Sequence, residues 1–374
     1  MEINGAKMFV KALQEEGVDT LFAYPGGTAI DLFDALYDAE GIDMILPRHE
    51  QALVHAADGY ARSTGRVGVC LVTSGPGATN LVTGIATANY DSVPLVCFTG
   101  QVPMNLIGND AFQEVDIVGI TRSICKYAVT VRKREDLARI IKNAFYIART
   151  GKPGPVVVDI PKDIQLAMGS DEYPTEVNIR GYKPSEGVHV GQIKRALAEL
   201  KNAKKPVFLC GGGVNIAHAR KEMQELAEKT GIPVVTTIMG KGAIPTDHPL
   251  YVGNIGMHGN MASNKAIMES DVLFSIGCRF NDRITGTIDT FAKNAKIIHV
   301  DIDAASISRN IKVDIPIVAD AKVAISKMLE YAEPLDIKGW VDDIMNVKAE
   351  YPINMNRYDG VTPEAIIRTI NDMY

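Results

Sequence analysis

A glutamate stands at the start of a helical pattern, where a carboxylate could do acid–base chemistry. The stretch "RHEQALVHAADGYARST" opens with Arg48, His49 and Glu50 and continues with small apolar residues at helical spacing. A glutamate at this position usually stabilises the positive end of the helix dipole. If it were desolvated against a bound ring, it could instead hold or take a proton. The four residues "RHEQ" alone leave both interpretations open.

Two glycine-rich turns accompany this glutamate, "YPGGTAIDLF" and "TSGPGATN", each directly after an apolar run. Glycine turns let backbone N–H groups approach a ligand closely at a helix start, although a tight strand-to-helix connection is the plainer alternative. Ligands of parallel α/β sheets bind at the carboxyl ends of strands, so the turns and the glutamate could face one crevice. The candidate ligand contacts in the turns are Tyr24, Pro25, Gly26, Gly27, Pro76 and Asn80.

Three further loops are rich in glycine: "GGGV" from Gly211, "GNIGMHGN" from Gly253, and "GCRFNDRITG" from Gly277. The first resembles a dinucleotide-binding turn, but it lacks the full G-x-G-x-x-G spacing and is weak alone. Arg279 and Arg283 in the third loop could bind an anion bidentately. Flexible surface loops are the alternative explanation for the second and third stretches.

The elements that must position these residues alternate between helical patterns and short apolar strands. Continuous apolar strands separated by helices indicate parallel sheets covered on both faces, so we predict an α/β protein with doubly wound domains. The predicted helices are Gly5–Glu16, Ala29–Ala39, Gln51–Thr64, Ala78–Ser92, Glu135–Thr150, Val190–Lys201, Ala217–Thr230 and Met261–Glu269. The predicted strands are "TLFAYP", "DMILPR", "VGVCLVTS", "PLVCFTG", "GPVVVDIP", "KPVFLCGGG", "PVVTTI", "DVLFSIG" and "AKIIHVDID".

The pattern divides the chain into parts. We predict a first α/β domain over 1–165, a linker rich in Gly, Pro and charge over 166–188, and a second α/β domain over 189–335. A helix-like stretch around Trp340–Tyr351 and the loop "PINMNRYDGV" follow. Thr362 as N-cap and Pro363 in the first turn then start a helix well. We expect 336–374 to be a linker and the first helix of a further domain.

Composition excludes several classes of function. The 374 residues are 46% hydrophobic and 22% charged, with a net charge of −6, which is typical of a soluble globular protein and argues against a nucleic-acid partner. The five cysteines form no C-x-x-C pair and mostly lie in apolar runs, so we expect reduced thiols in the cytoplasm. The N-terminus does not read as a signal peptide, and no apolar run is long enough for a membrane span. No H-E-x-x-H metal motif and no G-x-S-x-G motif is present.

Taken together, the sequence resembles the catalytic subunits of acetohydroxyacid synthase (acetolactate synthase), within the thiamine-diphosphate enzymes. The resemblance covers essentially the whole chain. It rests on "YPGG", "RHEQ", "GYARSTGRVGV", "TSGPGATN", "GQVP", "DAFQE", "GPVVVDIPKD", "GMHG" and "RFNDR", which occur in this order.

The resemblance implies a role for each matched residue. The glutamate, here Glu50, would hydrogen-bond the aminopyrimidine of thiamine diphosphate, so that the cofactor's own nitrogen removes the thiazolium proton. Pyruvate would then lose carbon dioxide and be condensed with a second 2-ketoacid, pyruvate or 2-ketobutyrate, in branched-chain amino-acid biosynthesis. Gly27 and Gln113 would lie near the reacting centre. The substrate channel would contain Phe112, Lys162, Met257, Asp282 and Arg283, with Arg283 a candidate for the acceptor carboxylate.

The resemblance also implies FAD in the second domain, where the flavin is largely structural. The residues expected near it are Lys152, Gly211, Gly212, Gly213, Gly256, Met257, His258, Arg279, Asp301 and Asp320. Two positions depart from the family pattern: Asn281 replaces the usual Asp, and Lys152 replaces the usual Arg and loses its bidentate fork.

The third departure concerns magnesium. The family holds Mg²⁺ and the diphosphate with G-D-G followed by N-N, and G-D-G is absent here. We therefore expect no metal ligands in this chain, a diphosphate site in the domain that would begin near Thr362, and no activity of this chain by itself.

Other functions stay open at this stage. One alternative is another thiamine-diphosphate-dependent 2-ketoacid decarboxylase or ligase, although "RFNDR" and "GMHG" speak against it. A second is a non-catalytic homologue that binds a flavin or nucleotide. As partners, the resemblance implies small 2-ketoacids, a second copy in a homodimer or tetramer, and a small regulatory subunit.

Overall fold

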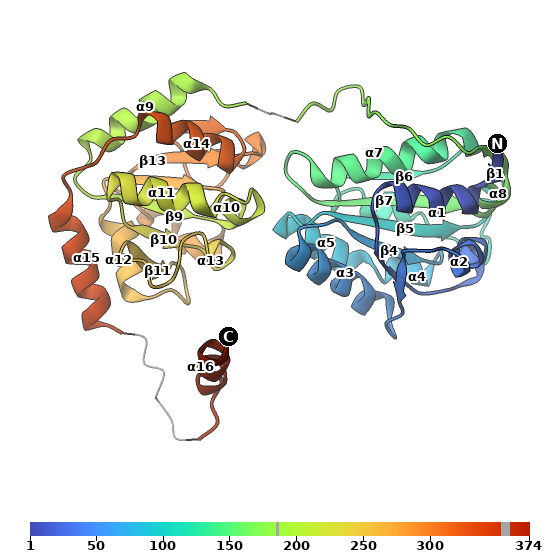
Figure 1. Cartoon of the computed structure of the whole chain (residues 1–374), viewed down its shortest axis with the longest axis horizontal. Helices are drawn as coiled ribbons and strands as arrows, with labels where there is room; N and C mark the ends of the chain where they lie inside the picture. Colours follow the sequence, from blue (N-terminus) through green and yellow to red (C-terminus); the bar gives the residue numbers. More distant parts are fainter. Residues whose placement is uncertain (185–186, 353–359) are drawn as a thin grey trace. The chain divides into compact units, whose positions relative to one another are not determined.

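The computed structural model describes residues 1–184, 187–352 and 360–374. The chain divides into two compact units, Met1–Pro184 and Ser185–Tyr374 (Figure 1). Each unit is built around its own parallel sheet with helices on both faces. The predicted fold class, two doubly wound α/β domains, is confirmed.

The sheet of the first unit has the strand order β3-β2-β4-β5-β7-β6, and every pair is parallel. Its central strands are buried from end to end because helices cover both faces. In this order the strands are β3 (Asp43–Ile45), β2 (Thr20–Ala23), β4 (Gly68–Val72), β5 (Leu95–Gln101), β7 (Pro155–Pro161) and β6 (Tyr127–Thr130).

Side chains that alternate along these strands form two cores. On one face, α1 (Gly5–Glu15), α2 (Ile30–Tyr37) and α7 (Leu137–Arg149) pack around Phe9, Phe98 and Phe145. On the other face, α3 (Glu50–Thr64), α5 (Val82–Asp91) and α6 (Ile117–Thr121) pack around the side chains of Leu53, Cys97 and Val157. The helices predicted from periodicity therefore pack their apolar faces against the sheet.

The predictions were wrong at short elements. The helix predicted over Ala78–Ser92 is two helices, α4 (Pro76–Thr79) and α5. The helix predicted from Ala29 begins with a 3₁₀ turn at Gly27–Ala29, and the one from Glu135 with a 3₁₀ turn at Arg134–Asp136. The segment predicted as a linker over 166–188 contains β8 (Met168–Ser170), which pairs antiparallel with β1 (Glu2–Asn4). The elements β6, α6 and α8 (Lys162–Leu166) were not predicted.

The sheet of the second unit has the strand order β11-β10-β9-β12-β13-β14 and is also parallel throughout. β11 and β14 were not predicted. In this order the strands are β11 (Tyr251–Asn254), β10 (Val234–Thr236), β9 (Pro206–Cys210), β12 (Val272–Ile276), β13 (Lys296–Asp301) and β14 (Ile315–Val318).

Helices cover this second sheet as well. One group of helices packs around α14 (Ala321–Tyr331), namely α9 (Val190–Asn202) and α11 (Arg220–Thr230). A second pair is formed by α12 (Met261–Glu269) and α15 (Lys338–Glu350). Trp340 of α15 is buried and donates its indole N–H to Pro206 O at 3.1 Å. The helix predicted over Ala217–Thr230 is α11, which begins later, at Arg220. The short helix α10 (Gly212–Ile216) before it was not predicted, and His218 has a positive φ of 51° between the two.

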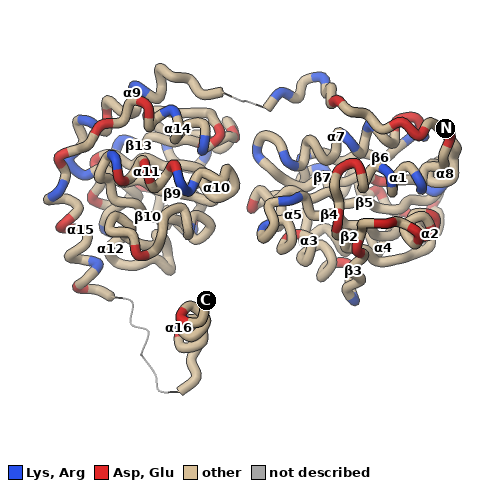
Figure 2. The backbone as a smooth tube through the Cα atoms, in the orientation of Figure 1, with Lys and Arg blue, Asp and Glu red and all other residues tan. Residues whose placement is uncertain are grey.

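The last described helix is α16 (Pro363–Met373), which begins as predicted because Thr362 Oγ1 accepts the N–H of Ala365 at 3.1 Å. Residues 353–359 of the loop predicted before it lie outside the described residues. Positive and negative side chains are interspersed along both units (Figure 2). Over the described ranges, no helix is both long and apolar enough to cross a membrane.

Candidate functional site

The glutamate of "RHEQ" opens α3 and is held by an asparagine from the next glycine-rich turn. His49 is the N-cap, and its Nδ1 accepts the N–H of Gln51 at 3.0 Å. Asn80 Nδ2 donates to Glu50 Oε2 at 2.9 Å. Glu50 is only partly buried. A single amide therefore occupies one oxygen of a carboxylate that stands at the positive end of a helix.

The other oxygen of Glu50 faces a glycine. A methyl group placed on Gly77 would lie 3.5 Å from Glu50 Oε1 and 2.8 Å from Thr73 Cγ2. A methyl group on Gly26 would lie 2.5 Å from Thr73 Cβ. Glycine is required at Gly26 because the two turns approach each other there, and at Gly77 because its own turn folds back on Thr73.

Hydrogen bonds lock these two turns together. Thr28 Oγ1 lies 3.0 Å from Thr73 Oγ1, and the N–H of Ser74 donates to Thr28 Oγ1 at 3.0 Å. Pro76 then occupies the first turn of α4, and the N–H of Tyr24 donates to Leu71 O at 2.9 Å. The structure thus brings "YPGG", "RHEQ" and "TSGPGATN" to one edge of the first sheet.

A third loop closes on the same edge. Gly75 has φ of 58°, and a methyl group there would lie 2.5 Å from Gln113 O. Gln113 also has a positive φ of 58°, which is uncommon for a residue other than glycine. The neighbouring Phe112 side chain is 85% exposed. The predicted residue Gln113 therefore lies beside the "TSGPG" turn.

Two further predicted residues, Gly27 and Lys162, have different neighbours from Glu50. A methyl group on Gly27 would meet nothing within 4 Å, so open space borders this residue. Lys162 is the first residue of α8, and its Nζ lies 3.8 Å from Asp31 Oδ2 on α2. This contact links Lys162 to the α2 side of the unit.

In the second unit, the "GMHG" and "RFNDR" loops contact each other. The N–H of Met257 donates to Arg283 O at 3.0 Å, and Arg283 Nη1 lies 3.8 Å from Met257 Sδ. Asp282 and Arg283 are in the first turn of α13 (Asp282–Thr285). Asn281, which departs from the family pattern, is the N-cap and makes no side-chain capping bond. His258 and Arg283 are exposed.

The glycines of "GGGV" are explained by packing within the chain. A methyl group on Gly211 would lie 2.1 Å from Gly277 O, and one on Gly213 would lie 2.7 Å from Gly277 Cα. Gly212 is looser, with Met239 Cβ at 3.1 Å. Close contact between the loops after β9 and β12 thus accounts for two of the three glycines without a ligand.

The remaining flavin candidates occupy separate places. Asp301 ends β13, is 8% exposed, and accepts the N–H of Asp303 at 2.9 Å. Asp320 caps α14 by accepting two backbone N–H groups. Arg279 is half-buried after β12. Lys152 belongs to the first unit, before β7, where burial and then the charge of Lys152 lower the pKa of Lys126 to about 8.

A buried polar group that the sequence analysis missed lies behind this edge of the first sheet. Asp159 on β7 is 2% exposed and accepts hydrogen bonds from Thr99, Gln101 and Thr130. Burial raises its pKa to about 6. The only signal in the sequence is a carboxylate inside the apolar run "GPVVVDIP".

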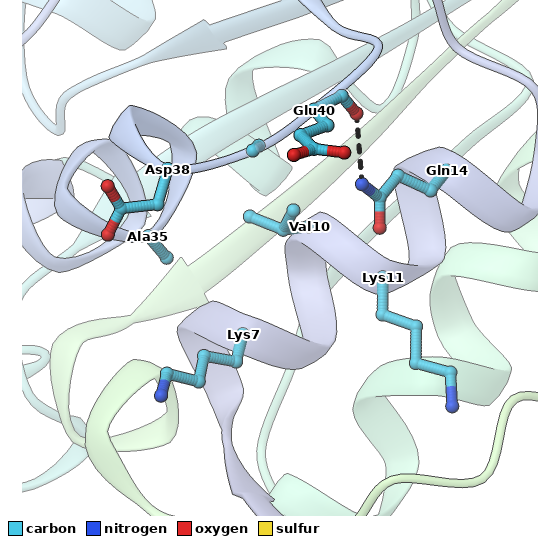
Figure 3. A pocket seen from close by; sticks show the side chains of 8 residues that line it. Lys7, Val10, Lys11, Gln14, Ala35, Asp38 and Glu40 are labelled. Atoms are coloured by element: carbon cyan, nitrogen blue, oxygen red, sulfur yellow. Dashed lines mark hydrogen bonds between the residues drawn. The ribbon is translucent and has the colours of Figure 1, made fainter.

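A groove on the opposite face of the first unit is not part of this site. It lies between α1 and α2 and has a volume of about 360 Å³. Figure 3 shows its polar lining, in which Gln14 donates to the backbone oxygen of Glu40. Within the described parts of the chain, no group of three His, Cys, Asp or Glu side chains could hold a metal ion.

Two family models match the chain, one in each unit. Residues 3–120 match the family "Thiamine pyrophosphate enzyme, N-terminal TPP binding domain", and residues 193–328 match "Thiamine pyrophosphate enzyme, central domain". The first match includes Glu50, Asn80 and Gln113, and the second includes the "GMHG" and "RFNDR" loops.

Curated relatives are similar over nearly the whole chain. A probable acetolactate synthase large subunit of Methanococcus aeolicus is 48% identical over 98% of this chain and 64% of its own length. The acetolactate synthase large subunit of Haemophilus influenzae is 46% identical, over 99% and 66%. The acetolactate synthase isozyme 3 large subunit of Escherichia coli is 46% identical, over 98% and 66%. The chain spans slightly less than two thirds of these relatives, and it belongs to the thiamine pyrophosphate enzyme family, of which it carries the N-terminal and central domains.

Proposed function

We propose that this chain serves an acetolactate synthase as part of the catalytic large subunit. The reaction is the decarboxylating condensation of pyruvate with a second 2-ketoacid, pyruvate or 2-ketobutyrate. The observation that carries the proposal is the Glu50 carboxylate, held by Asn80 at 2.9 Å and facing Gly77, at the edge where three loops meet. Relatives at 46–48% identity with this name support it.

The residues at this edge fit the pyrimidine ring of thiamine diphosphate. Gly77 leaves free the space beside Glu50 Oε1 that a methyl group would occupy in van der Waals contact, so a ring nitrogen can approach that oxygen. Asn80 occupies Oε2 and fixes the plane of the carboxylate. In our proposal Glu50 shares a proton with that ring nitrogen.

When bound, thiamine diphosphate supplies a nucleophilic carbon for the 2-ketoacid carbonyl and accepts the electrons released as carbon dioxide leaves. The residues of the chain bind and orient the substrates. In the first unit, Gly27, Gln113 and Phe112 border the edge, and Lys162 provides a cation. In the second unit, we assign the acceptor carboxylate to Arg283, whose exposed guanidinium lies beside Met257 and follows Asp282.

We extend the proposal to FAD, Mg²⁺ and assembly. A flavin would lie along the loops at the carboxyl ends of β9, β11, β12 and β13, where glycines and Asp301 gather. This support is weaker than that for thiamine diphosphate, because Gly211 and Gly213 already pack against Gly277. Mg²⁺ would accompany the diphosphate. The words "large subunit" in the relatives' names support a small regulatory subunit, and we propose a homodimer or tetramer.

The test is a Glu50→Gln substitution with Glu15→Gln as matched control, since Glu15 is an exposed residue at the end of α1. Acetolactate formation from pyruvate is measured in the protein extended to the length of its relatives, with thiamine diphosphate and Mg²⁺ added. We expect Glu50→Gln to lower the rate by roughly 10²-fold or more, since the amide cannot share the proton. Equal rates for both variants would refute the role of Glu50.

A further inference from the structure

A buried carboxylate lies behind the candidate site with only neutral partners. Thr99 Oγ1 donates to Asp159 Oδ1 at 2.6 Å, while Thr130 Oγ1 and Gln101 Nε2 each donate to Oδ2 at 3.2 Å. Within the described ranges, no ion pair of Asp159 is recorded. A buried carboxylate without a cation costs stability, so its retention calls for a reason other than stability.

The reason lies in Gln101, whose amide makes three hydrogen bonds. Its Nε2 donates both to Asp159 and to Val115 O, at 3.2 and 3.0 Å. Its Oε1 accepts the N–H of Val102 at 2.9 Å. Gln101 therefore joins the first residue of the segment 102–115 to its last residue. The carboxylate of Asp159 holds the amide from the sheet side, in the orientation that both segment ends require.

The segment that Gln101 clamps carries Phe112 and Gln113. Most of its residues from Asn105 to Gln113 are exposed, so few side chains anchor it to the core. Most of its further bonds stay within the segment, such as Gly108 N–H to Glu114 Oε1 at 3.0 Å, while Met104 N–H donates outside it, to Asp163 Oδ1 at 3.1 Å. The place of Gln113 against Gly75 thus depends on how the two ends of the segment are held.

We propose that Asp159 is a positioning residue, which orients the Gln101 amide so that it clamps the segment 102–115 and keeps Gln113 at the edge formed by Glu50, Asn80 and Gly77. The importance of that edge rests on the proposed function. The clamp itself does not depend on it.

Protonation of Asp159 should loosen this clamp. The carboxylate faces the side of the sheet covered by α5 and α6, where Asp116 at the start of α6 is its charged neighbour and Cys97 and Cys125 are thiols. Burial raises the pKa of Asp159 to about 6, and the nearby charge of Asp116 adds to this. Protonation in mildly acidic solution would convert one accepting oxygen to a donor, which weakens the bond from Gln101.

The experiment measures hydrogen-exchange protection of the backbone amides of 102–116 in this chain. The variants are Asp159→Leu, Gln101→Met and the double variant. Thr130→Val is the control, since Thr130 bonds the same carboxylate but no part of the segment. Asp159→Asn is the conservative variant, because its one oxygen can still accept from Gln101. Melting temperatures establish that every variant folds.

We expect Asp159→Leu and Gln101→Met each to lower the protection of these amides by about tenfold or more. This is the effect of losing one or two hydrogen bonds that hold the segment. The double variant should be no worse than either single one, since Asp159 acts through Gln101. Thr130→Val should leave protection unchanged, and Asp159→Asn should retain most of it. In the wild type, protection corrected for intrinsic exchange should fall between pH 7.5 and 5, but not in Asp159→Asn.

Three results would overturn the proposal. These are unchanged protection in Asp159→Leu, additive losses in the double variant, and identical pH profiles for the wild type and Asp159→Asn. Exchange is measured without substrate or cofactor, so a failure of the proposed reaction would leave these results standing. Conversely, loss of the clamp would not contradict the role of Glu50.

Discussion

At the scale of single residues, the site depends on glycines that allow close approach. Gly26, Gly75 and Gly77 each face an atom at which a side chain would clash, namely Thr73 Cβ, Gln113 O and Thr73 Cγ2. Gly26 and Gly75 thereby let two different loops touch, whereas Gly77 lets the "TSGPG" turn fold back on its own Thr73 beside Glu50.

Gly77→Ala should destabilise the first unit, because its methyl group would lie 2.8 Å from Thr73 Cγ2. The matched control is Gly59→Ala, because Gly59 is exposed in the middle of α3 and a methyl group there would meet nothing within 4 Å. We expect the control to raise stability by ~1 kcal/mol, the ordinary gain from replacing glycine in a helix. Thermal melting followed by circular dichroism checks both, and a higher melting temperature for Gly77→Ala would contradict the packing argument.

Asp159 should make stability depend on pH in an unusual direction. Burial raises its pKa from an ordinary value of 3.8 to about 6, so the folded protein holds this proton more tightly than the unfolded chain does. The resulting stability is fully present below pH 4 and is lost as pH rises through 6. The difference between the two pKa values corresponds to ~3 kcal/mol.

Urea unfolding at several pH values checks this prediction. Relative to Asp159→Asn, the wild type should lose ~3 kcal/mol of unfolding free energy between pH 4 and pH 7. Subtracting the two curves removes the contribution of the other carboxylates. A difference that stays constant over this range would show that Asp159 keeps its ordinary pKa in the fold.

At the scale of elements, length decided what could be predicted from the sequence. Helices with three or more turns, such as α1, α3, α7 and α9, show clear periodicity and were predicted nearly to the residue. The elements β1, β6, β8, α6 and α8 have only three to five residues, too few to show a period. The pairing of β1 with β8 joins residues far apart in the sequence, which no local pattern reveals.

The residues of the candidate site also divide into those that the sequence predicts and those that it does not. The glycine turns and Glu50 could be found because they follow apolar strands, whose carboxyl ends meet at one edge of a parallel sheet. Asp159 and Gln101 could not, because polar residues inside buried strands have no characteristic spacing. Their partners lie on the neighbouring strands β5 and β6, and only the strand order places them together.

Glu16 ties three elements of the first unit together. Its side chain is 2% exposed and pairs with Lys142 at 2.8 Å and Arg149 at 3.2 Å on α7, and it accepts from Tyr173 Oη at 3.1 Å. Glu16→Gln should cost ~2 kcal/mol, because it removes a buried charge from two cations and a phenol. The control, Glu330→Gln, breaks an exposed pair with Lys327 and should change nothing measurable. Urea unfolding compares them, and equal midpoints would mean that the Glu16 cluster adds no stability.

At the scale of the whole molecule, the two units have separate cores. The clusters around Phe98 and Cys97 are confined to the first unit, and the cluster around Phe208 and Phe274 is confined to the second. Separate cores are the usual condition for units that unfold independently. The single tryptophan, Trp340, lies in the second core, so its fluorescence reports on that unit alone.

This arrangement predicts that damage to the first unit will not reach Trp340. Both units contribute to the circular-dichroism signal. In Glu16→Gln, the contribution of the first unit should melt at a lower temperature than in the wild type. The midpoint of the Trp340 fluorescence change should stay at its wild-type value. The reciprocal variant is Trp340→Phe, which loses the indole bond to Pro206 and should destabilise only the second unit. If fluorescence and circular dichroism shifted together in Glu16→Gln, the two cores would unfold as one cooperative unit.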